Sequence, residues 1–216
     1  MTQPIPRFVV VEGPIGVGKT TLARRLAESL GCELLLEDPA DNPFLERFYQ
    51  DPRRAALPTQ LHFLLQRTRQ IQALRQGDMF QPVQVADFMM QKDRLFAELT
   101  LDAQELRLYE QLYTHLTLDV PTPDLVIYLQ APVAVLRERI ARRGVAYEAG
   151  IERGYLDRLV EAYTRFFYYY DQTPLLIVNA AEIDFAHNDE DYRTLLERVR
   201  TLGSGRHYFN PVPVTP

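Results

Sequence analysis

The sequence predicts an α/β fold in which a doubly wound, parallel five-stranded sheet is flanked by helices. Short apolar runs recur along the 216 residues, at 8–11, 33–36, 83–86, 125–129 and 175–178. The stretches between these runs carry helical spacing of apolar residues and are long enough for crossover connections. Because the runs are apolar on both faces, each strand needs helices on both sides, as in a parallel sheet.

Helices are expected in the connections between the strands. Pro43 and Pro132 suit the first turn of a helix, whereas Gly31, Gly77 and Gly144 are typical of helix ends. We expect one domain over residues 1–203 and a mobile tail over 204–216, because the glycines and prolines of the tail leave no periodic apolar face. The expected helices span 19–30, 43–50, 59–75, 103–118, 132–143, 155–171 and 190–202.

The composition favours a small-molecule partner. With a formal net charge of −5 and a pI near 5.4, the chain has no broad basic field, which argues against a nucleic acid partner. The single cysteine, Cys32, excludes an internal disulfide, and the four histidines are too scattered for a metal cage. We find neither a signal peptide nor an apolar stretch of about 20 residues, so we expect no membrane association and a cytoplasmic location.

The first apolar run leads into a phosphate-binding motif. Gly13, Gly18, Lys19 and Thr20 fit Gly-x-x-x-x-Gly-Lys-Thr, between an expected strand and an expected helix. Backbone N–H groups of such a loop surround a polyphosphate, while the lysine reaches the β- and γ-phosphates and the threonine hydroxyl faces Mg²⁺. We therefore expect ATP to bind to Gly13, Pro14, Ile15, Gly16, Val17, Gly18, Lys19, Thr20 and Thr21.

Acidic residues follow the second and third apolar runs. Glu37 and Asp87 should lie at the carboxyl edge of the sheet, where open parallel sheets bind their ligands. A phosphotransferase needs one carboxylate to orient or deprotonate the attacking hydroxyl, and often a second for Mg²⁺. Glu37 is the candidate base, and Asp87 with Thr20 is the candidate metal site, directly or through water. The alternative is that both acids are ordinary strand ends or helix caps.

Arginines end the helix that follows the fourth apolar run. Arg139, Arg142 and Arg143 lead into the segment 144–150, which has glycine at both ends and is typical of a hinged lid. Lid guanidinium groups neutralise the transferring phosphoryl group, so these arginines are candidate catalytic residues. Basic residues in a last helical turn also favour the helix dipole and solvent, which explains part of the cluster without catalysis.

Several sequence blocks occur together in a fairly specific order and spacing. They are the motif from Gly13 to Thr21, Glu37-Asp38-Pro39, Asn42-Pro43-Phe44-Leu45 with Phe48-Tyr49, Gln60 with Arg67, Asp93-Arg94, and Arg139-Ile140-Ala141-Arg142-Arg143-Gly144. Over most of 8–202 the chain resembles the deoxynucleoside kinase family, especially its purine and cytosine members. The resemblance implies a P-loop kinase fold with a short arginine-bearing lid, ATP as phosphoryl donor with Mg²⁺, and a homodimer.

The resemblance also implies roles for residues around the sugar and the phosphates. Glu37 matches the general base for the 5′-hydroxyl of a deoxynucleoside. Tyr49 and Glu148 match the pair that holds the sugar 3′-hydroxyl, a contact that leaves little space for a 2′-hydroxyl. Arg139 and Arg143 match lid arginines.

A further set of residues matches the family's base pocket. Gln60 matches a glutamine that reads the base edge, and Arg67 with Asp93 match a charged pair that completes the reading. Guanine has an O6/N7 acceptor face and N1/N2 donors, so a guanidinium and a carboxylate complement it, and a purine fits best. Phe63 is expected to wall the base pocket by stacking. A surface position is the alternative for each of the three: Gln60 and Arg67 lie seven residues apart on one helix face, and Asp93 follows Lys92 in a common solvated pattern.

The segment Asp87-Phe88-Met89 departs from the family pattern. Many members have Glu-Arg-Ser at this point, with the arginine at the reacting phosphate, so this chain keeps the acid and lacks the arginine. Arg142 or Arg94 is a candidate for replacing the lost charge. Slow turnover and a rearranged phosphate clamp are the alternatives.

Two other functions compete with nucleoside phosphorylation. A nucleoside monophosphate kinase of thymidylate kinase type would need an extra cation near Glu37 for the acceptor phosphate, and the sequence neighbours of Glu37 supply none. A nucleotide-binding subunit without catalysis is favoured by Phe88, but the intact Lys19 and Glu37 argue against it.

Overall fold

A parallel sheet forms the centre of the molecule in the computed structural model, which describes residues 6–76, 84–118 and 120–210. Its strands are β1 (Phe8–Glu12), β2 (Glu33–Leu35), β3 (Gln84–Ala86), β4 (Leu125–Gln130), β5 (Leu175–Asn179) and β6 (Arg206–Phe209). Their order across the sheet is β2-β3-β1-β4-β5-β6, and every pair is parallel. The chain starts in the middle of the sheet and winds outwards on both sides, which confirms the doubly wound fold.

The strand count is a correction, because the described residues form six strands instead of the expected five. In β6, His207 lies opposite Leu176 and Phe209 opposite Val178, whereas the sequence analysis placed these residues in a mobile tail. β6 is a short edge strand whose side chains alternate between exposed and half-buried, so it lacks the apolar run that predicts a strand. The rest of the expected tail, 211–216, lies outside the described residues, as do Gly77 and the start of the expected third strand at 83.

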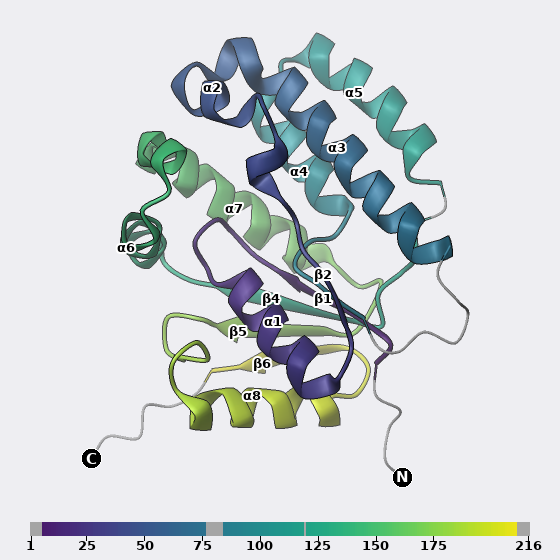
Figure 1. Cartoon of the computed structure of the whole chain (residues 1–216), viewed down its shortest axis with the longest axis vertical. Coiled ribbons are helices and arrows are strands. Elements are labelled where there is room, and N and C mark those ends of the chain that lie inside the picture. Colours follow the sequence, from purple (N-terminus) through teal and green to yellow (C-terminus); the bar gives the residue numbers. More distant parts are fainter. Residues whose placement is uncertain (1–5, 77–83, 119, 211–216) are drawn as a thin grey trace.

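Helices cover both faces of the sheet because alternate strand residues point to opposite sides (Figure 1). Val9 and Val11 pack with α1 (Lys19–Leu30) and α8 (Asp189–Thr201). On the opposite face, Val10 belongs to a core with α4 (Gln91–Thr100) and α7 (Arg153–Tyr169). α6 (Val133–Arg143) contributes to both cores, through Leu136 and Ile140.

A helical layer extends the molecule beyond β2 and β3, in the upper half of Figure 1. It contains α2 (Leu45–Gln50), α3 (Pro52–Gln76), α4 and α5 (Ala103–Leu116), and Leu64, Phe88 and Tyr109 lie in its core. α3 begins before the expected residue 59 and continues through Pro58. α4 was not predicted, because it has only ten residues and follows β3 almost directly.

Short 3-10 helices complete the description: η1 (Pro39–Asp41) follows β2, and η2 (Ala146–Gly150) follows α6. Among the residues that the structure describes, no helix is both long enough and apolar enough to cross a membrane.

Candidate active site

The loop of residues 13–18, between β1 and α1, has the backbone shape of a phosphate cradle, and we call it the P-loop. Gly13 and Gly18 have φ angles of 150° and 107°, which only glycine adopts without strain. A Cβ on Gly13 would also lie 2.5 Å from the Leu129 carbonyl oxygen, so the loop packs too closely for a side chain. The P-loop runs into the N-terminus of α1, where unpaired N–H groups and the helix dipole favour an anion.

Lys19 lies against the P-loop. Its Nζ donates hydrogen bonds to the carbonyl oxygens of Gly13 (2.8 Å) and Pro14 (3.2 Å). Burial, and after it the positive charge of Lys92, lowers the pKa of Lys19 to about 7. An anion at the P-loop would favour the charged ammonium, so the site is suited to a polyphosphate.

Glu12 ties the P-loop to two other segments and was missed by the sequence analysis. This fully buried carboxylate accepts hydrogen bonds from the backbone N–H of Gly13 (2.9 Å) and of Met89 (3.0 Å). It also accepts a hydrogen bond from the hydroxyl of Tyr163 in α7, at 3.0 Å. A strand-end acid of this kind stabilises the position of the loop.

Asp87 links the P-loop to Glu37. Its Oδ2 accepts a hydrogen bond from the Thr20 hydroxyl at 2.5 Å, and its Oδ1 accepts one from the backbone N–H of Glu37 at 2.8 Å. Mg²⁺ prefers oxygen ligands and usually takes few from the protein, so a hydroxyl and a carboxylate beside a phosphate cradle fit this ion. No larger cluster of three or more His, Cys, Asp or Glu side chains suited to a metal occurs within the described residues.

A cavity of about 280 Å³, which we call the acceptor cavity, joins the P-loop to the helical layer. Lys19, Thr20 and Asp87 lie in its wall on the P-loop side. The same cavity is also lined by most of the residues expected to bind a nucleoside: Glu37, Tyr49, Gln60, Phe63, Arg67 and Glu148. Asp93, which was expected among them, is fully buried and does not line the cavity.

Four charged side chains form a buried cluster at the centre of this site. The Glu37 carboxylate accepts from Arg67 and, at 2.9 Å, from Lys92 Nζ, while Arg67 also pairs with Asp93. Arg67, Lys92 and Asp93 are at most 4% exposed, and Glu37 is 13% exposed. Burial lowers the pKa of Arg67 to about 10 and that of Lys92 to about 8. The cluster contains two acids and two cations, and Glu37 is oriented by both cations.

Gln60 and Phe63 both line the acceptor cavity. The Thr100 hydroxyl donates to the Phe96 carbonyl (2.7 Å), so its lone pairs face Gln60, which identifies the nearer Gln60 atom, at 3.3 Å, as the amide nitrogen. The Gln60 oxygen is then oriented to accept from a base. The Arg67 guanidinium lies 4.8 Å from the centre of the Phe63 ring, a cation–π contact that supports the guanidinium.

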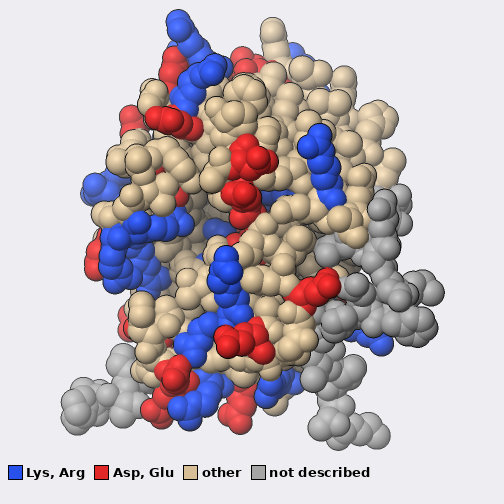
Figure 2. All heavy atoms as spheres, in the orientation of Figure 1, with Lys and Arg blue, Asp and Glu red and all other residues tan. Residues whose placement is uncertain are grey.

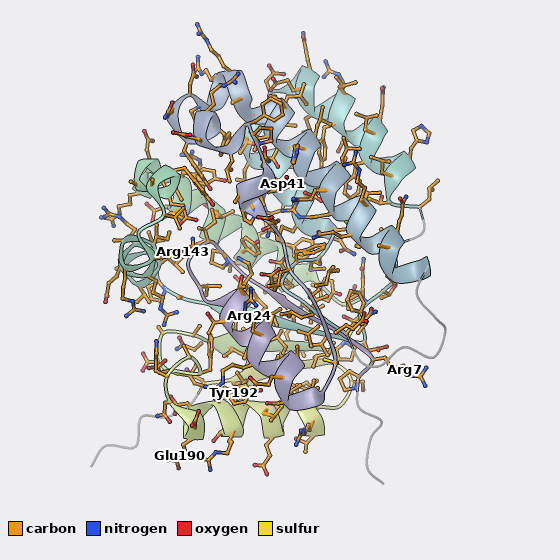
Figure 3. All side chains as sticks on the ribbon, viewed as in Figure 1. Arg7, Arg24, Asp41, Arg143, Glu190 and Tyr192 are labelled. Carbon is orange, nitrogen blue, oxygen red and sulfur yellow. The ribbon has the colours of Figure 1, made fainter. Side chains whose placement is uncertain are left out.

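Glu148 belongs to η2 and lines the acceptor cavity together with Tyr49. The ring of Tyr49 is stacked on Tyr147 with centroids 6.3 Å apart, and burial raises the pKa of Tyr49, so its hydroxyl remains a hydrogen-bond donor. Arg143 forms two hydrogen bonds with Glu148: its Nε and a terminal nitrogen donate to the two carboxylate oxygens at 3.0 and 2.5 Å. Arg143 extends from the end of α6 toward this site (Figure 3).

The expected lid arginines do not share one position. Arg139 donates to the carbonyl oxygens of Val17 (3.1 Å) and Ala180 (2.7 Å), so it connects the P-loop to the turn after β5. Arg139, Arg142 and Arg143 line a second cavity of about 300 Å³ on the other side of the P-loop, which we call the donor cavity. Figure 2 shows arginine side chains gathered over α6 on this face. Arg143 alone of the three also lines the acceptor cavity.

Position 88 holds a phenylalanine in place of the family's arginine, and Arg94 does not bring a cation to Glu37 either. Phe88 is 1% exposed and belongs to the core of the helical layer. Arg94 is 56% exposed and pairs with Glu98 and Glu110 on the outside of α4 and α5. Besides Arg67, the cation that contacts Glu37 is Lys92, which the sequence analysis missed because it expected no helix over 91–100 and because a Lys-Asp pair is a common solvated pattern.

Comparison with known proteins identifies the family. The deoxynucleoside kinase family model matches residues 9–203. The chain is 34% identical over 204 residues to the deoxyguanosine kinase of Bacillus subtilis (strain 168), with 90% of this chain and 97% of the relative covered. It is 28% identical over 217 residues to the deoxyadenosine kinase of Lactobacillus acidophilus (strain ATCC 700396 / NCK56 / N2 / NCFM), with 92% and 99% covered.

A solved structure supports the fold. The deoxyadenosine kinase from M. mycoides with bound dCTP superposes with a TM-score of 0.79 at 22% identity, over 90% of this chain and 100% of that one. Since the family match spans nearly all of the described residues, from β1 past the end of α8, this chain belongs to the deoxynucleoside kinase family.

Proposed function

We propose that this protein transfers the γ-phosphoryl group of ATP to the 5′-hydroxyl of a purine deoxynucleoside, deoxyguanosine or deoxyadenosine, in nucleotide salvage. The observation that carries the proposal is the acceptor cavity, which is lined both by Lys19 and Thr20 and by Glu37 with Gln60 and Arg67. The names of the relatives, deoxyguanosine kinase and deoxyadenosine kinase, support a purine.

The roles of the side chains follow from their positions. ATP lies with its phosphates on the P-loop, and Lys19 turns from the loop carbonyls to the β- and γ-phosphates. Glu37 orients the 5′-hydroxyl and accepts its proton as the new O–P bond forms. Tyr49 and Glu148 bind the 3′-hydroxyl, and the packing of Tyr49 on Tyr147 of η2 leaves little room at the 2′ position.

The base is read by Gln60 and Arg67, while Asp93, which is fully buried, acts through Arg67. Arg67 donates to acceptors such as O6 and N7 of guanine, and Asp93 holds the guanidinium in place. Gln60, anchored on Thr100, presents its oxygen to a donor of the base. This combination accepts both purines.

Mg²⁺ belongs to the proposal as the metal partner of ATP. Thr20 and Asp87 are the residues that would hold it, directly or through water. When bound, it neutralises charge on the β- and γ-phosphates. We further propose a cytoplasmic homodimer, on the strength of the family resemblance.

The argument against a nucleoside monophosphate kinase requires a correction. The sequence analysis found no cation beside Glu37, but Arg67 and Lys92 both contact it, so the expected lack of a cation does not argue against an acceptor phosphate. The argument against that reading is instead the family match over residues 9–203.

An ADP-release assay tests the proposed function. We expect turnover with deoxyguanosine or deoxyadenosine and at least about tenfold lower kcat/KM with the matching ribonucleosides, because a crowded 2′ position costs about 1.4 kcal/mol or more. The assay compares the four deoxynucleosides, their ribose counterparts and the monophosphates. Turnover with monophosphates alone would reject the proposal.

A further inference from the structure

Lysine is used in only two places in this chain. The sequence has 22 arginines and two lysines, Lys19 and Lys92. Both lysines line the acceptor cavity, whereas the exposed cations of the molecule are arginines. Both compact ammonium groups of this chain, whose donors can rotate, therefore lie at the acceptor cavity.

Lys92 makes fewer hydrogen bonds than a buried ammonium requires. Its side chain is 4% exposed, and in the described part of the chain its one hydrogen-bond acceptor is Glu37 Oε2, at 2.9 Å. The ring of Phe96 lies 5.8 Å from the same nitrogen and supplies only a weak contact. An ammonium has three N–H donors, so two are left for a group that enters the cavity.

The position of Lys92 suits an anion between the nucleoside and the P-loop. Lys92 and Lys19 line the same cavity, so two positive charges face one enclosed space. Their repulsion is relieved when a negatively charged group lies between them. The group that passes between ATP and the sugar hydroxyl at this place is the γ-phosphoryl group.

Other cations of the chain are less well placed for this task. Arg67 is shared by Glu37 and Asp93, and Arg94 pairs with two glutamates on the outer surface. Arg142 lines the donor cavity but not the acceptor cavity, and Arg143, which lines both, is already paired with the two carboxylate oxygens of Glu148. Lys92 lies four residues after Phe88, where α4 brings its ammonium to Glu37.

We propose that Lys92 is a catalytic cation that contacts the γ-phosphoryl oxygens during transfer and takes the place of the arginine absent at Phe88. This inference rests on the proposed function. In the step, the bond between Pγ and the β,γ-bridging oxygen breaks, and ADP leaves with that electron pair. A bond between the 5′-oxygen and Pγ forms, and the 5′-hydroxyl proton moves to Glu37. Lys92 keeps its proton throughout and balances charge on the equatorial oxygens.

Steady-state and binding measurements on Lys92→Met test the inference. We expect kcat to fall by about 10²-fold or more, the usual scale for losing a preorganised charge at a transition state, while KM values and ADP affinity stay within about threefold. The ADP–fluoroaluminate–deoxynucleoside complex, a transition-state analogue, should weaken by a similar factor of about 10². Lys92→Arg should restore part of the lost kcat.

The matched control is Arg94→Met, which removes a cation two residues further along α4 and should leave kcat unchanged. A kcat of Lys92→Met within threefold of wild type, or equal weakening of ADP, nucleoside and analogue, would overturn the inference. If wild type turns over deoxynucleosides in either case, the proposed function stands. If wild type turns over none of the four, both fall.

A measurement on the wild-type protein does not depend on the variant folding. Because the chain has two lysines, acetylation with acetic anhydride followed by mass spectrometry reports on Lys19 and Lys92 separately. We expect ADP alone to protect Lys19, and ADP–fluoroaluminate with deoxynucleoside to protect Lys92 as well, by at least about fivefold. Equal labelling of Lys92 with ADP and with the analogue would contradict the contact.

Discussion

Glu37, the proposed base, is held in place by three other side chains. Its backbone N–H is held by Asp87 at 2.8 Å, and its carboxylate is held by Arg67 and Lys92. Since both oxygens are engaged, the carboxylate has little freedom to rotate, and a hydroxyl that enters the cavity meets it in a defined orientation. Such preorganisation is the contribution that a protein makes to phosphoryl transfer.

Substitution of Glu37 by Gln tests the role of this carboxylate. We expect nucleoside affinity to stay within a few fold and kcat to fall by roughly 10²-fold or more, because an amide of nearly the same shape cannot accept the 5′-hydroxyl proton. Steady-state kinetics with the preferred deoxynucleoside measure both quantities.

Asp38→Asn is the control, since Asp38 is an exposed neighbour that only caps η1 through Ala40 N–H, and it should behave like wild type. If Glu37→Gln turned over as fast as the wild-type enzyme, another group would be the base.

Helices and strands place these side chains by where they begin and end. β1, β2 and β3 end at Glu12, Leu35 and Ala86, so the P-loop, Glu37 and Asp87 follow at the same edge of the sheet. α4 then starts at Gln91 and carries Lys92 and Asp93 in its first turn. The sequence analysis found the strand ends but not α4, and for that reason it missed Lys92.

β6 stabilises α7 through Arg206. The Arg206 guanidinium donates to the carbonyl oxygens of Phe167, Tyr168 and Tyr170, at 3.1, 2.8 and 3.0 Å, where α7 ends. These carbonyls have no partner inside the helix, and a cation near a helix C-terminus is favourable. We expect Arg206→Ala to lower the free energy of unfolding by roughly 1 kcal/mol and Tm by about 2–4 °C, in thermal and urea denaturation.

Arg193→Ala provides the comparison, because Arg193 is an exposed residue of α8 whose side chain makes no hydrogen bond to the described residues. A Tm for Arg206→Ala equal to that of Arg193→Ala would show that β6 does not support α7.

The molecule as a whole carries an electrostatic cost in its active site. Lys92 is surrounded by charges from several elements, and burial still lowers its pKa to about 8. The ordinary lysine pKa is about 10.4, so below pH 8 both folded and unfolded chains bind the proton, and the folded chain bears the full cost of the buried charge. The facing charged groups are Lys19, Glu37, Arg67, Glu12 and Asp87.

The stability of the chain should therefore rise with pH through this group. Between about pH 8 and pH 10.4 the unfolded chain binds more protons than the folded chain, so the free energy of unfolding increases with pH. Relative to Lys92→Met, wild type should gain about 1–2 kcal/mol between pH 7 and pH 9.5. Urea denaturation of both proteins across this range measures the difference.

In the same experiment, the free energy of unfolding of Arg94→Met should change with pH as that of wild type does. A difference between wild type and Lys92→Met that does not change with pH would mean that the Lys92 pKa is close to that of an exposed lysine.

Local patterns were enough to predict most of the fold. The runs at 8–11 and 125–129 became β1 and β4 within one residue, because buried parallel strands are apolar on both faces. The glycines of the P-loop and the helix ends at Gly31 and Gly144 could be predicted, since glycine adopts backbone conformations that other residues avoid. β6 and α4 were not readable, because an edge strand and a short helix leave weak periodicity.

Residue types and motif order also predicted that Glu37, Gln60 and Arg67 belong to one site, and the three line one cavity. Which charged side chains pair with one another could not be predicted from the sequence. Glu37 meets Arg67 across 30 residues and Lys92 across 55, and Arg139 binds Ala180 rather than the acceptor cavity. Composition and spacing record what each segment can form alone, whereas the burial of a charge depends on which partner the packing of distant segments brings within hydrogen-bond distance.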